Sequence, residues 1–415
     1  MDIEHTFQAV RQARKELARM DDRTRQDILG AVADEIILAR EELLEANALD
    51  LSRMDGNNPM YDRLMLNAER LEGIAGDMRR VAQLPCPLGR TLKEVRRPNG
   101  MVLRRESVPF GVIGVVYEAR PNVGFDVFSL CFKSGNACIL KGGSDARESN
   151  EAIVRLIHRV LVRCGVSPDV IALMPPSRES TAQLLGAVGM VDLVIPRGSR
   201  KLIDFVRQTA KVPVIETGAG VVNMYFDESG DREIGRRCIT NAKTRRVSVC
   251  NALDCLLIHR SRLGDLPFLC ADLAEKGVEI FADETAKTAL QGNYPDDKLG
   301  DADSGSYGLE FLSMRMALRV VDSIDEALQH IEQYGSGHSE SIIAEDEQTV
   351  ARFRQDVDAA CIYVNLPTSF TDGGEFGLGA EIGISTQKLG ARGPMGLEEL
   401  TTYKWIAEGR GQVRP

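Results

Sequence analysis

The sequence lacks any run of about 18 consecutive apolar residues, the length that a transmembrane helix needs. Its first 20 residues are charged and helix-periodic, without the apolar centre of a secretory signal peptide. It also lacks an excess of positive charge, because its 415 residues carry a formal net charge of −10. These absences predict a protein with no membrane partner and no nucleic-acid partner.

Several common site patterns are missing as well. The nine cysteines are odd in number, scattered and never spaced as C-x-x-C, which favours free thiols and a cytoplasmic location. The five histidines lack the spacing of metal ligands, so we expect no metal. No G-x-G-x-x-G, Walker A or H-E-x-x-H pattern is present. Function therefore has to be sought in less common combinations of residues.

The length and balance of residues are typical of a globular protein of two or three domains, with 43% hydrophobic and 27% charged residues. Residues 1–85 have helical periodicity. Residues 91–109 alternate apolar and charged side chains around Pro98-Asn99-Gly100, which predicts a two-stranded hairpin. This polar ribbon has little core of its own, and the strand-like residues 401–409 are a candidate to pair with it.

Two series of short apolar runs separated by helical segments predict parallel sheets built from βαβ units. The first series occupies residues 111–118, 137–143, 170–175, 191–198 and 212–218; the second, from about residue 232, occupies 254–260, 278–283, 316–323 and 360–365. Ligands bind at the carboxyl ends of such strands. In the first series those ends carry glycines, charged residues and one asparagine.

Four candidate groups have both a functional and an ordinary interpretation. Cys250 follows a basic loop, and nearby cations activate a thiol by lowering its pKa, but a structural cysteine is the commoner case. Lys141, before Gly-Gly-Ser, could hold a ribose or phosphate or could be a solvated strand end. Asn122 could stabilise an oxyanion or belong to a Pro-Asn turn. Glu216 could be a general base or an ordinary exposed carboxylate.

The combination of these segments resembles the aldehyde dehydrogenase superfamily and, within it, the gamma-glutamyl phosphate reductases. The resemblance is carried by residues 108–123, 133–150, 191–199, 241–252, 334–342 and 371–397, which span nearly the whole chain in the expected order. It implies an α/β fold of the aldehyde dehydrogenase type with three parts. These are a Rossmann-like NADP-binding domain (1–87 and 109–231), an α/β catalytic domain (232–397) and a small β oligomerisation element (88–108 and 398–415).

The resemblance also implies a reaction and its residues. NADPH would reduce L-glutamate 5-phosphate to L-glutamate 5-semialdehyde with release of phosphate, through a thioester, in proline biosynthesis. The implied catalytic residues are Cys250 and Asn122; the cofactor-binding residues are Lys141, Gly143, Ser144, Arg197, Gly198 and Ser199; the substrate-binding residues are Arg120, Lys243 and Arg246. A homo-oligomer is expected, with glutamate kinase as a candidate partner in functional coupling.

Two rival functions stay open at this point. A hydrolytic NAD(P)-dependent aldehyde dehydrogenase would use Glu216 to activate water, whereas a reductase that releases phosphate has no need of that water. A non-catalytic relative kept as a scaffold is the second rival, supported only by a departure from the family pattern. Related sequences commonly carry arginine where Ser369 stands, and proline where Val247 stands. Loss of an arginine contact with a substrate anion would remove about 1.5–3 kcal/mol of binding free energy.

Overall fold

The computed structural model describes residues 2–56, 58, 60–218 and 220–414. The chain forms two compact units. The first unit comprises residues 1–217, 376–383 and 389–415, and the second comprises residues 218–375 and 384–388. None of the helices in these described residues is long and apolar enough to cross a membrane.

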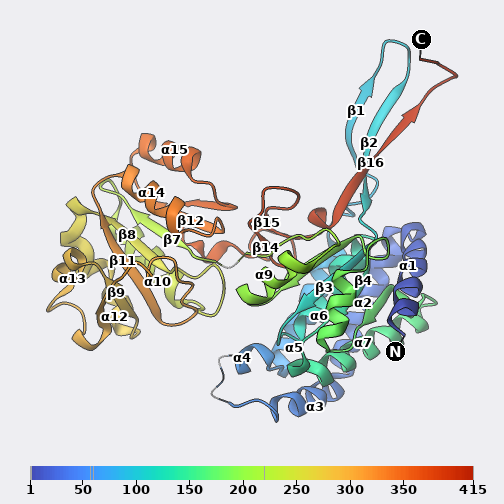
Figure 1. Cartoon of the computed structure of the whole chain (residues 1–415), viewed down its shortest axis with the longest axis horizontal. Helices are drawn as coiled ribbons and strands as arrows, with labels where there is room; N and C mark the ends of the chain where they lie inside the picture. Colours follow the sequence, from blue (N-terminus) through green and yellow to red (C-terminus); the bar gives the residue numbers. More distant parts are fainter. Residues whose placement is uncertain (1, 57, 59, 219, 415) are drawn as a thin grey trace. The chain divides into compact units, whose positions relative to one another are not determined.

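The first unit begins with helices, as its periodicity predicts (Figure 1). Its helices are α1 (Ile3–Arg19), α2 (Asp22–Leu38), α3 (Arg40–Leu51), α4 (Tyr61–Leu64), α5 (Ala68–Gln83), α6 (Asn122–Lys133), α7 (Arg147–Arg163), α8 (Arg178–Leu185) and α9 (Arg200–Thr209). Asp2 caps α1 by accepting hydrogen bonds from the backbone N–H groups of Glu4 and His5. The buried side chains of α1, Phe7, Val10 and Leu17 among them, lie on one face.

A four-stranded parallel sheet lies among these helices. Its strands are β3 (Val112–Tyr117), β4 (Ala137–Lys141), β5 (Ile171–Leu173) and β6 (Leu193–Arg197), in the order β5-β4-β3-β6. The chain runs from β3 outward to β5 and then returns to β6 on the other side of β3. Ligands in open α/β sheets bind at the carboxyl ends of the strands where the order reverses, which here are the loops after β3 and β6.

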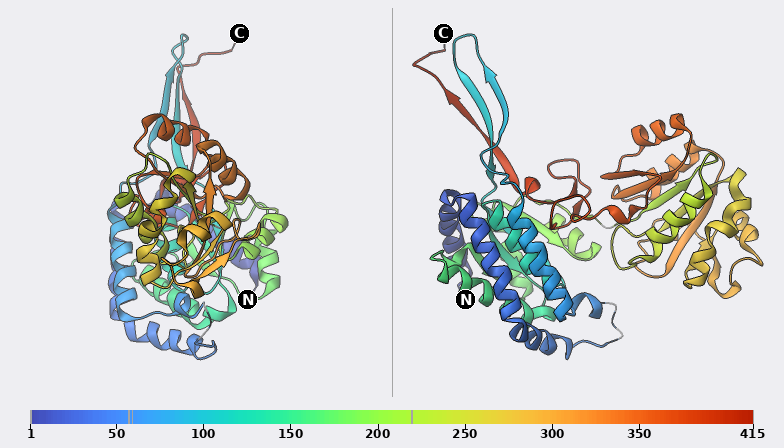
Figure 2. Two further views of the ribbon diagram at one scale, coloured as in Figure 1. Left: turned by 90° about the vertical axis from the view of Figure 1, so that its left-hand side faces the viewer. Right: turned by 180° about the vertical axis from the view of Figure 1, so that it is seen from behind.

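The predicted hairpin is confirmed and has a third strand. Strand β1 (Thr91–Arg96) pairs antiparallel with β2 (Val102–Pro109), and Gly100 has the positive φ of 84° that the turn requires. Strand β16 (Thr401–Glu408) pairs with β2 along its whole length, as its strand-like sequence suggested. Figures 1 and 2 show this three-stranded ribbon projecting from the sheet and helices of the first unit.

The second unit has a seven-stranded parallel sheet in the order β10-β9-β11-β8-β7-β12-β13. The strands are β7 (Asn223–Phe226), β8 (Cys255–His259), β9 (Glu279–Ala282), β10 (Leu299–Asp301), β11 (Arg315–Val321), β12 (Ser339–Ile343) and β13 (Cys361–Val364). Its helices are α10 (Arg232–Thr244), α11 (Leu266–Leu269), α12 (Ala271–Glu275), α13 (Glu284–Leu290), α14 (Ile324–Tyr334) and α15 (Glu347–Asp356).

Short elements complete the two units. Strands β14 (Ile384–Ser385) and β15 (Gly393–Pro394) have two residues each. The 3-10 helices are η1 (Ser144–Ala146), η2 (Pro168–Val170), η3 (Arg260–Asp265), η4 (Asp296–Lys298), η5 (Thr368–Phe370) and η6 (Glu398–Leu400).

The strand predictions were wrong in particular places. Residues 212–218 form no strand: Val194 exchanges two backbone hydrogen bonds with Pro213 and Ile215, and Pro213 has no N–H to extend the ladder. Strands β7, β10 and β12 were not predicted. Strand β12 begins Ser-Glu-Ser, and all three residues are buried, so its polar sequence does not indicate that it is an internal strand of the sheet.

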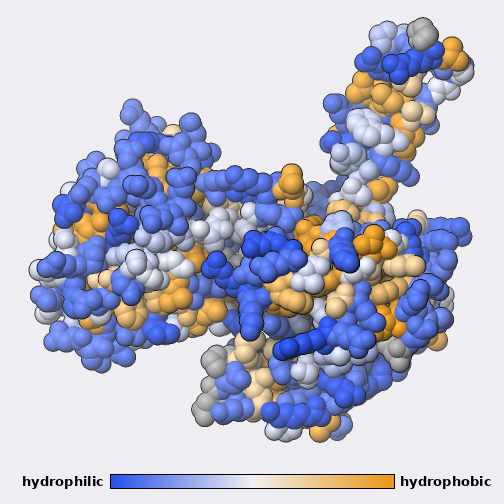
Figure 3. All heavy atoms as spheres, viewed as in Figure 1, coloured by the Kyte–Doolittle hydropathy of each residue, from blue (hydrophilic) through white to orange (hydrophobic). Residues whose placement is uncertain are grey.

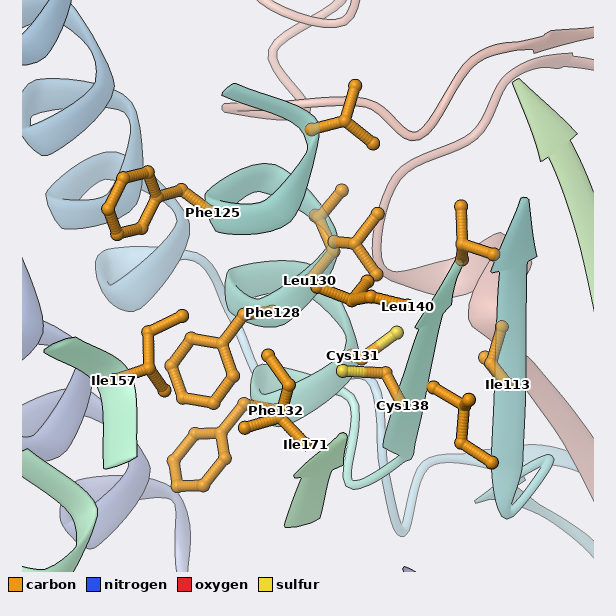
Figure 4. Close-up of a cluster of buried hydrophobic side chains, with 14 of the residues drawn as sticks. Ile113, Phe125, Phe128, Leu130, Cys131, Phe132, Cys138, Leu140, Ile157 and Ile171 are labelled. Atoms are coloured by element: carbon orange, nitrogen blue, oxygen red, sulfur yellow. The ribbon is translucent and has the colours of Figure 1, made fainter. Parts of the chain in front are cut away.

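Both sheets are covered by apolar side chains. In the first unit, Phe128 and Phe132 of α6 pack with their ring centroids 5.1 Å apart, beside Cys131 and Cys138 (Figure 4). In the second unit, neighbouring residues of β7, β8, β9, β11 and β12 face two separate apolar clusters, one containing Phe226 and the other Tyr225. A sheet buried on both faces explains the continuous apolar runs in the sequence.

Candidate active site

The loop after β3 holds the predicted oxyanion donor. Asn122 is the first residue of α6, at the carboxyl edge of the sheet, and is partly exposed. Its side-chain Nδ2 donates a hydrogen bond of 2.9 Å to Oδ2 of Asp126, one helical turn further on. Ala119, in the same loop, has a φ of 31°, an unusual conformation for a residue with a side chain, and such strain clusters at functional sites.

Asp126 was not among the predicted site residues, although its i, i+4 spacing from Asn122 is visible in the sequence. Burial of its carboxyl group and the neighbouring carboxylate of Asp77 raise the pKa of Asp126 to about 7. The hydrogen bond from Asn122 and the positive charge of Arg197 act to lower that pKa. Asp126 therefore changes charge near neutral pH, beside the predicted oxyanion donor.

The loop after β6 is tied to the loop after β3. The backbone N–H of Ser199 donates to Oε2 of Glu118 over 2.8 Å, and Ser199 Oγ also caps α9. A Cβ at Gly198 would lie 2.6 Å from the same Glu118 oxygen, so a side chain there would displace the Glu118 carboxylate. The predicted cofactor loop is thus held at the positive end of a helix dipole, where anions bind favourably. Glu118, 81 residues away in the chain, was not predicted.

Arg197 and Glu381 face each other at this edge. Nη2 of Arg197 lies 4.0 Å from Oε1 of Glu381, and both side chains are about one-fifth exposed. Glu381 belongs to the glycine-rich C-terminal segment that carried the family resemblance, but its role as the partner of Arg197 was not predicted.

A cavity of about 330 Å³ opens at the carboxyl ends of β4 and β5, beside the predicted cofactor residues. It is lined by Gly142, Gly143, Arg147, Asn150, Glu151, Leu173, Met174, Pro175 and Pro176. Arg147, which was not among the predicted site residues, brings a guanidinium group to this wall and donates to Glu151 over 3.0 Å. A cation, a pair of glycines and apolar walls could hold the adenosine end of a dinucleotide.

Lys141 lies next to this cavity but is turned inward. Its side chain is 6% exposed, and Nζ donates to the carbonyl oxygen of Gly142 over 3.0 Å. Burial lowers the pKa of its ammonium group. Of the other predicted cofactor residues, Ser144 begins η1 directly after the glycine pair.

Cys250 lies in the second unit, on the turn between α10 and β8, and is partly exposed. The segment before β7 packs directly against its backbone, because a Cβ at Gly220 would lie 1.6 Å from the Cys250 carbonyl oxygen. The next residue, Asn251, is fixed from the other side: its carbonyl accepts from Thr368 Oγ1, and its Nδ2 donates to the Thr371 carbonyl. The cysteine is therefore on a constrained turn and is partly exposed.

The basic residues before Cys250 have different surroundings. Arg246 is exposed and able to meet an anion. Lys243, predicted to bind substrate, has no exposed surface: its Nζ donates to the Leu253 carbonyl over 2.8 Å and lies near Asp254 and the Phe311 ring. Burial lowers the pKa of Lys243, and Asp254 acts in the opposite direction.

The other three residues discussed from the sequence lie in different surroundings. Arg120, in the β3 loop, is partly exposed. Ser369 is 7% exposed and donates to Asn241 Oδ1, while its carbonyl lies 3.4 Å from Asn251 Nδ2, so it borders the Cys250 turn. Glu216 belongs to the first unit and lies 3.8 Å from the Arg207 guanidinium group.

Comparison with known proteins agrees with this architecture. Residues 1–278 match the aldehyde dehydrogenase family. The crystal structure of an acetylating aldehyde dehydrogenase from Geobacillus thermoglucosidasius has the same fold, with a TM-score of 0.73 at 18% identity over 100% of this chain and 98% of that one. The chain belongs to the aldehyde dehydrogenase family.

More similar relatives narrow the assignment. A gamma-glutamyl phosphate reductase from Parabacteroides distasonis is 60% identical over 414 residues, covering 100% of both chains. The crystal structure of gamma-glutamyl phosphate reductase from Thermotoga maritima is 37% identical over 100% of both chains, with a TM-score of 0.94. Within its family the chain belongs to the gamma-glutamyl phosphate reductases, which confirms the resemblance found in the sequence.

Proposed function

We propose that this chain catalyses the NADPH-dependent reduction of L-glutamate 5-phosphate to L-glutamate 5-semialdehyde, with release of phosphate, in proline biosynthesis. The observation that carries the proposal is the 60% identity, over the full chain, to a protein named gamma-glutamyl phosphate reductase. The reaction requires a nucleophile, an oxyanion donor and a nicotinamide site, and the chain has a candidate for each.

In the first half-reaction, the thiolate of Cys250 attacks the carbonyl carbon of the acyl phosphate. A carbon–sulfur bond forms, the bond from that carbon to the phosphate oxygen breaks, and phosphate leaves with the electron pair. The product is a thioester on Cys250, which divides the reaction into two easier steps. The constrained turn around Cys250, closed by Gly220 and Asn251, favours a fixed direction of attack.

In the second half-reaction, the thioester carbonyl receives hydride, which is the chemistry a reduced nicotinamide supplies. The resulting thiohemiacetal oxyanion collapses, the carbon–sulfur bond breaks, and the aldehyde leaves the Cys250 thiolate free. Both tetrahedral species carry an oxyanion, for which we assign the Asn122 side-chain amide and the Cys250 backbone N–H as donors. One such donor is typically worth about 3–4 kcal/mol of transition-state stabilisation.

For the cofactor we propose NADP rather than NAD, with its adenosine end in the cavity beside Gly143 and Ser144. The cations Lys141 and Arg147 are the candidates to meet the 2′-phosphate. The pyrophosphate is assigned to the Arg197-Gly198-Ser199 loop, because this loop carries the Arg197 guanidinium group and leads into the positive end of the α9 dipole.

For the substrate we propose Arg120 and Arg246 as ligands of its phosphate or carboxylate, because guanidinium groups bind such anions in a bidentate manner. We do not assign Lys243 to binding of the substrate anion, because its enclosed ammonium group is already bound to the Leu253 carbonyl. We assign Lys243 instead to the support of the segment that joins Cys250 to β8.

We further propose that the chain is a homo-oligomer that assembles through the β1-β2-β16 ribbon. The ribbon's two outer strands have edges that β2 does not cover, and Tyr403 and Trp405 on β16 are each about half exposed. The free thiol that the reaction needs suits the reducing cytoplasm. Glutamate kinase, which makes an acyl phosphate prone to hydrolysis, is the candidate for functional coupling.

The first experiment is the reverse reaction. Glutamate 5-semialdehyde and NADP are supplied with and without inorganic phosphate, and absorbance of the reduced cofactor is followed. We expect reduction of NADP only when phosphate is present, since phosphate must resolve the thioester. Reduction without phosphate would mean that water resolves it, which would assign the chain to the hydrolytic aldehyde dehydrogenases and make Glu216 the next residue to replace.

Substitution of the nucleophile gives the second test. We expect Cys250→Ala to abolish turnover in both directions while the dissociation constant for NADPH, measured by fluorescence titration, stays within about twofold, because the thiol forms the thioester. Cys255→Ala is the matched control, since Cys255 is fully buried in β8. Turnover by the Cys250→Ala variant would rule out the covalent route.

A further inference from the structure

The hydrogen bond between Asn122 and Asp126 joins the proposed oxyanion donor to a titratable group. The two residues lie on the same face of α6, four positions apart, with Nδ2 of Asn122 2.9 Å from Oδ2 of Asp126. Asn122 has two N–H groups on Nδ2 and an acceptor oxygen on the other side of its amide. Which side faces the substrate depends on what Asp126 requires.

An ionised carboxylate accepts hydrogen bonds and cannot donate them. Beside such a carboxylate, the Asn122 amide must turn its NH₂ group toward Asp126, and one N–H remains for an oxyanion. A protonated carboxyl group is a donor as well, so it can bind the amide oxygen of Asn122 and stabilise the flipped orientation. In that orientation the NH₂ group no longer lies beside Asp126.

We propose that ionised Asp126 is a positioning residue, which holds the Asn122 amide with an N–H directed at the oxyanion of the reaction. This inference rests on the oxyanion role of Asn122 in the proposed function. Asp126 acts through Asn122 and has no contact with substrate in this role. Protonation of Asp126 releases the amide and lowers turnover.

The groups around Asp126 come from three other parts of the first unit. The carboxylates of Asp77 on α5 and Glu381 in the C-terminal segment disfavour its ionisation, and the guanidinium group of Arg197 at the end of β6 favours it. Asp77 is itself ion-paired with Arg80. With burial added, the pKa of Asp126 rises to about 7, so the ionised fraction grows as the pH rises through neutrality.

A double-mutant cycle tests the coupling. The variants are Asn122→Ala, Asp126→Ala and the double variant, and kcat for reduction of the acyl phosphate is measured together with the dissociation constant for NADPH. We expect about a hundredfold to a thousandfold loss for Asn122→Ala. For Asp126→Ala we expect a loss of about tenfold to a hundredfold, the worth of a charge-assisted hydrogen bond. The double variant should be no worse than Asn122→Ala, and NADPH binding should be unchanged throughout.

The pH profile of kcat provides a second readout, which a purely structural role would not move. The Asp126→Asn variant keeps the size of the side chain but has no charge to lose, so the fall in kcat below about pH 7 should disappear. The matched control is Asp77→Asn, which removes a neighbouring like charge without touching Asn122. In the Asp77→Asn variant, kcat should still fall as the pH is lowered, but the fall should occur at a lower pH than in the wild-type protein.

The outcomes separate this inference from the proposed function. Additive losses in the cycle, or an unchanged pH profile in Asp126→Asn, would overturn the positioning role and leave the reductase assignment intact. If Asn122→Ala retained full kcat, the oxyanion assignment itself would be wrong, and the positioning role would fall with it. Losses of kcat that do not add in the Asn122–Asp126 cycle, together with the loss of pH dependence in Asp126→Asn, would establish Asp126 as a positioning residue.

Discussion

Lys141 is a residue for which the structure adds a second candidate to the expectation made from sequence. Its ammonium group is buried and bound to the Gly142 carbonyl, and the cavity wall carries a second cation, Arg147. We predict that Lys141→Ala raises the Michaelis constant for NADPH more than that for NADH, because a lost cation weakens binding of the 2′-phosphate. Steady-state kinetics with both cofactors measures the ratio.

Arg147→Ala, assayed in parallel, identifies which of the two cations, Lys141 or Arg147, binds the 2′-phosphate. If Lys141→Ala changes both Michaelis constants equally while Arg147→Ala changes mainly that for NADPH, the role belongs to Arg147. Equal effects in both variants would mean that neither side chain distinguishes the two cofactors.

Lys243 illustrates the limit of sequence analysis at the residue scale. Lys243 stands close to Cys250 in the sequence, but whether a lysine on a helix faces solvent or the core depends on how that helix packs. In the structure α10 turns Lys243 inward, where the Leu253 carbonyl and the nearby Asp254 carboxylate stabilise its charge. Its neighbour Arg246, beyond the end of α10, is exposed.

At the scale of elements, the segment before β7 fixes the Cys250 turn. We predict that Gly220→Ala lowers kcat at least tenfold, because the new Cβ would overlap the Cys250 carbonyl and overpacking of this kind costs about 1–3 kcal/mol. The alkylation rate of Cys250 with iodoacetamide should change in the same variant. Gly264→Ala is the control, since a Cβ there meets nothing within 4 Å, and it should leave both measurements unchanged. Normal kinetics in Gly220→Ala would contradict the tight contact.

The contact between α14 and β11 predicts acid sensitivity in the second unit. His330 is buried and accepts a hydrogen bond of 2.9 Å from Arg319, and burial lowers the pKa of His330 to about 3. An unfolded chain takes up this proton near pH 6.5, so the folded state loses stability as the pH falls from 6.5 toward 3. The slope is at most about 1.4 kcal/mol per pH unit.

Hydrogen exchange of peptides from α14 and β11 measures this effect. We expect the wild-type protein to lose protection between pH 6.5 and 4.5, after correction for intrinsic exchange, and His330→Gln to lose less. His5→Gln, which replaces an exposed histidine, should behave as wild type. An identical pH dependence in His330→Gln would show that His330 does not contribute.

At the scale of the whole molecule, the ribbon should control assembly. Apolar side chains are visible along it in Figure 3, and Trp405 is 51% exposed. We predict that Trp405→Gln weakens self-association by at least about thirtyfold, the loss of one hot-spot side chain of about 2 kcal/mol. Sedimentation velocity across a concentration series measures it.

The control lies one position away. Lys404 faces the opposite side of β16, because side chains alternate along a strand, and Lys404→Gln should leave assembly unchanged. Equal effects of the two substitutions would point to damage to the strand rather than to a lost contact. A wild-type chain that sediments as a monomer would refute the proposed oligomer.

The sequence alone determined the family, the strands of the first parallel sheet, the helical N-terminal segment and the antiparallel hairpin. Each of these follows from local patterns, such as apolar periodicity or a Pro-Asn-Gly turn, or from motifs of consecutive residues. Strand β12 was not predicted, because its polar start, Ser-Glu-Ser, does not look like a buried strand. In the structure this start is buried, and the Asn223 backbone N–H donates to Glu340 over 2.9 Å.

Only the tertiary structure decided which distant side chains meet. Glu118 binds Ser199 across 81 positions, and Thr368 binds Asn251 across 117. It also decided that Lys243 is enclosed and that Asp126 titrates near neutrality. Such contacts and charges depend on how whole elements pack, because burial and the neighbours of a group are set by residues from several segments at once, and no local pattern contains them.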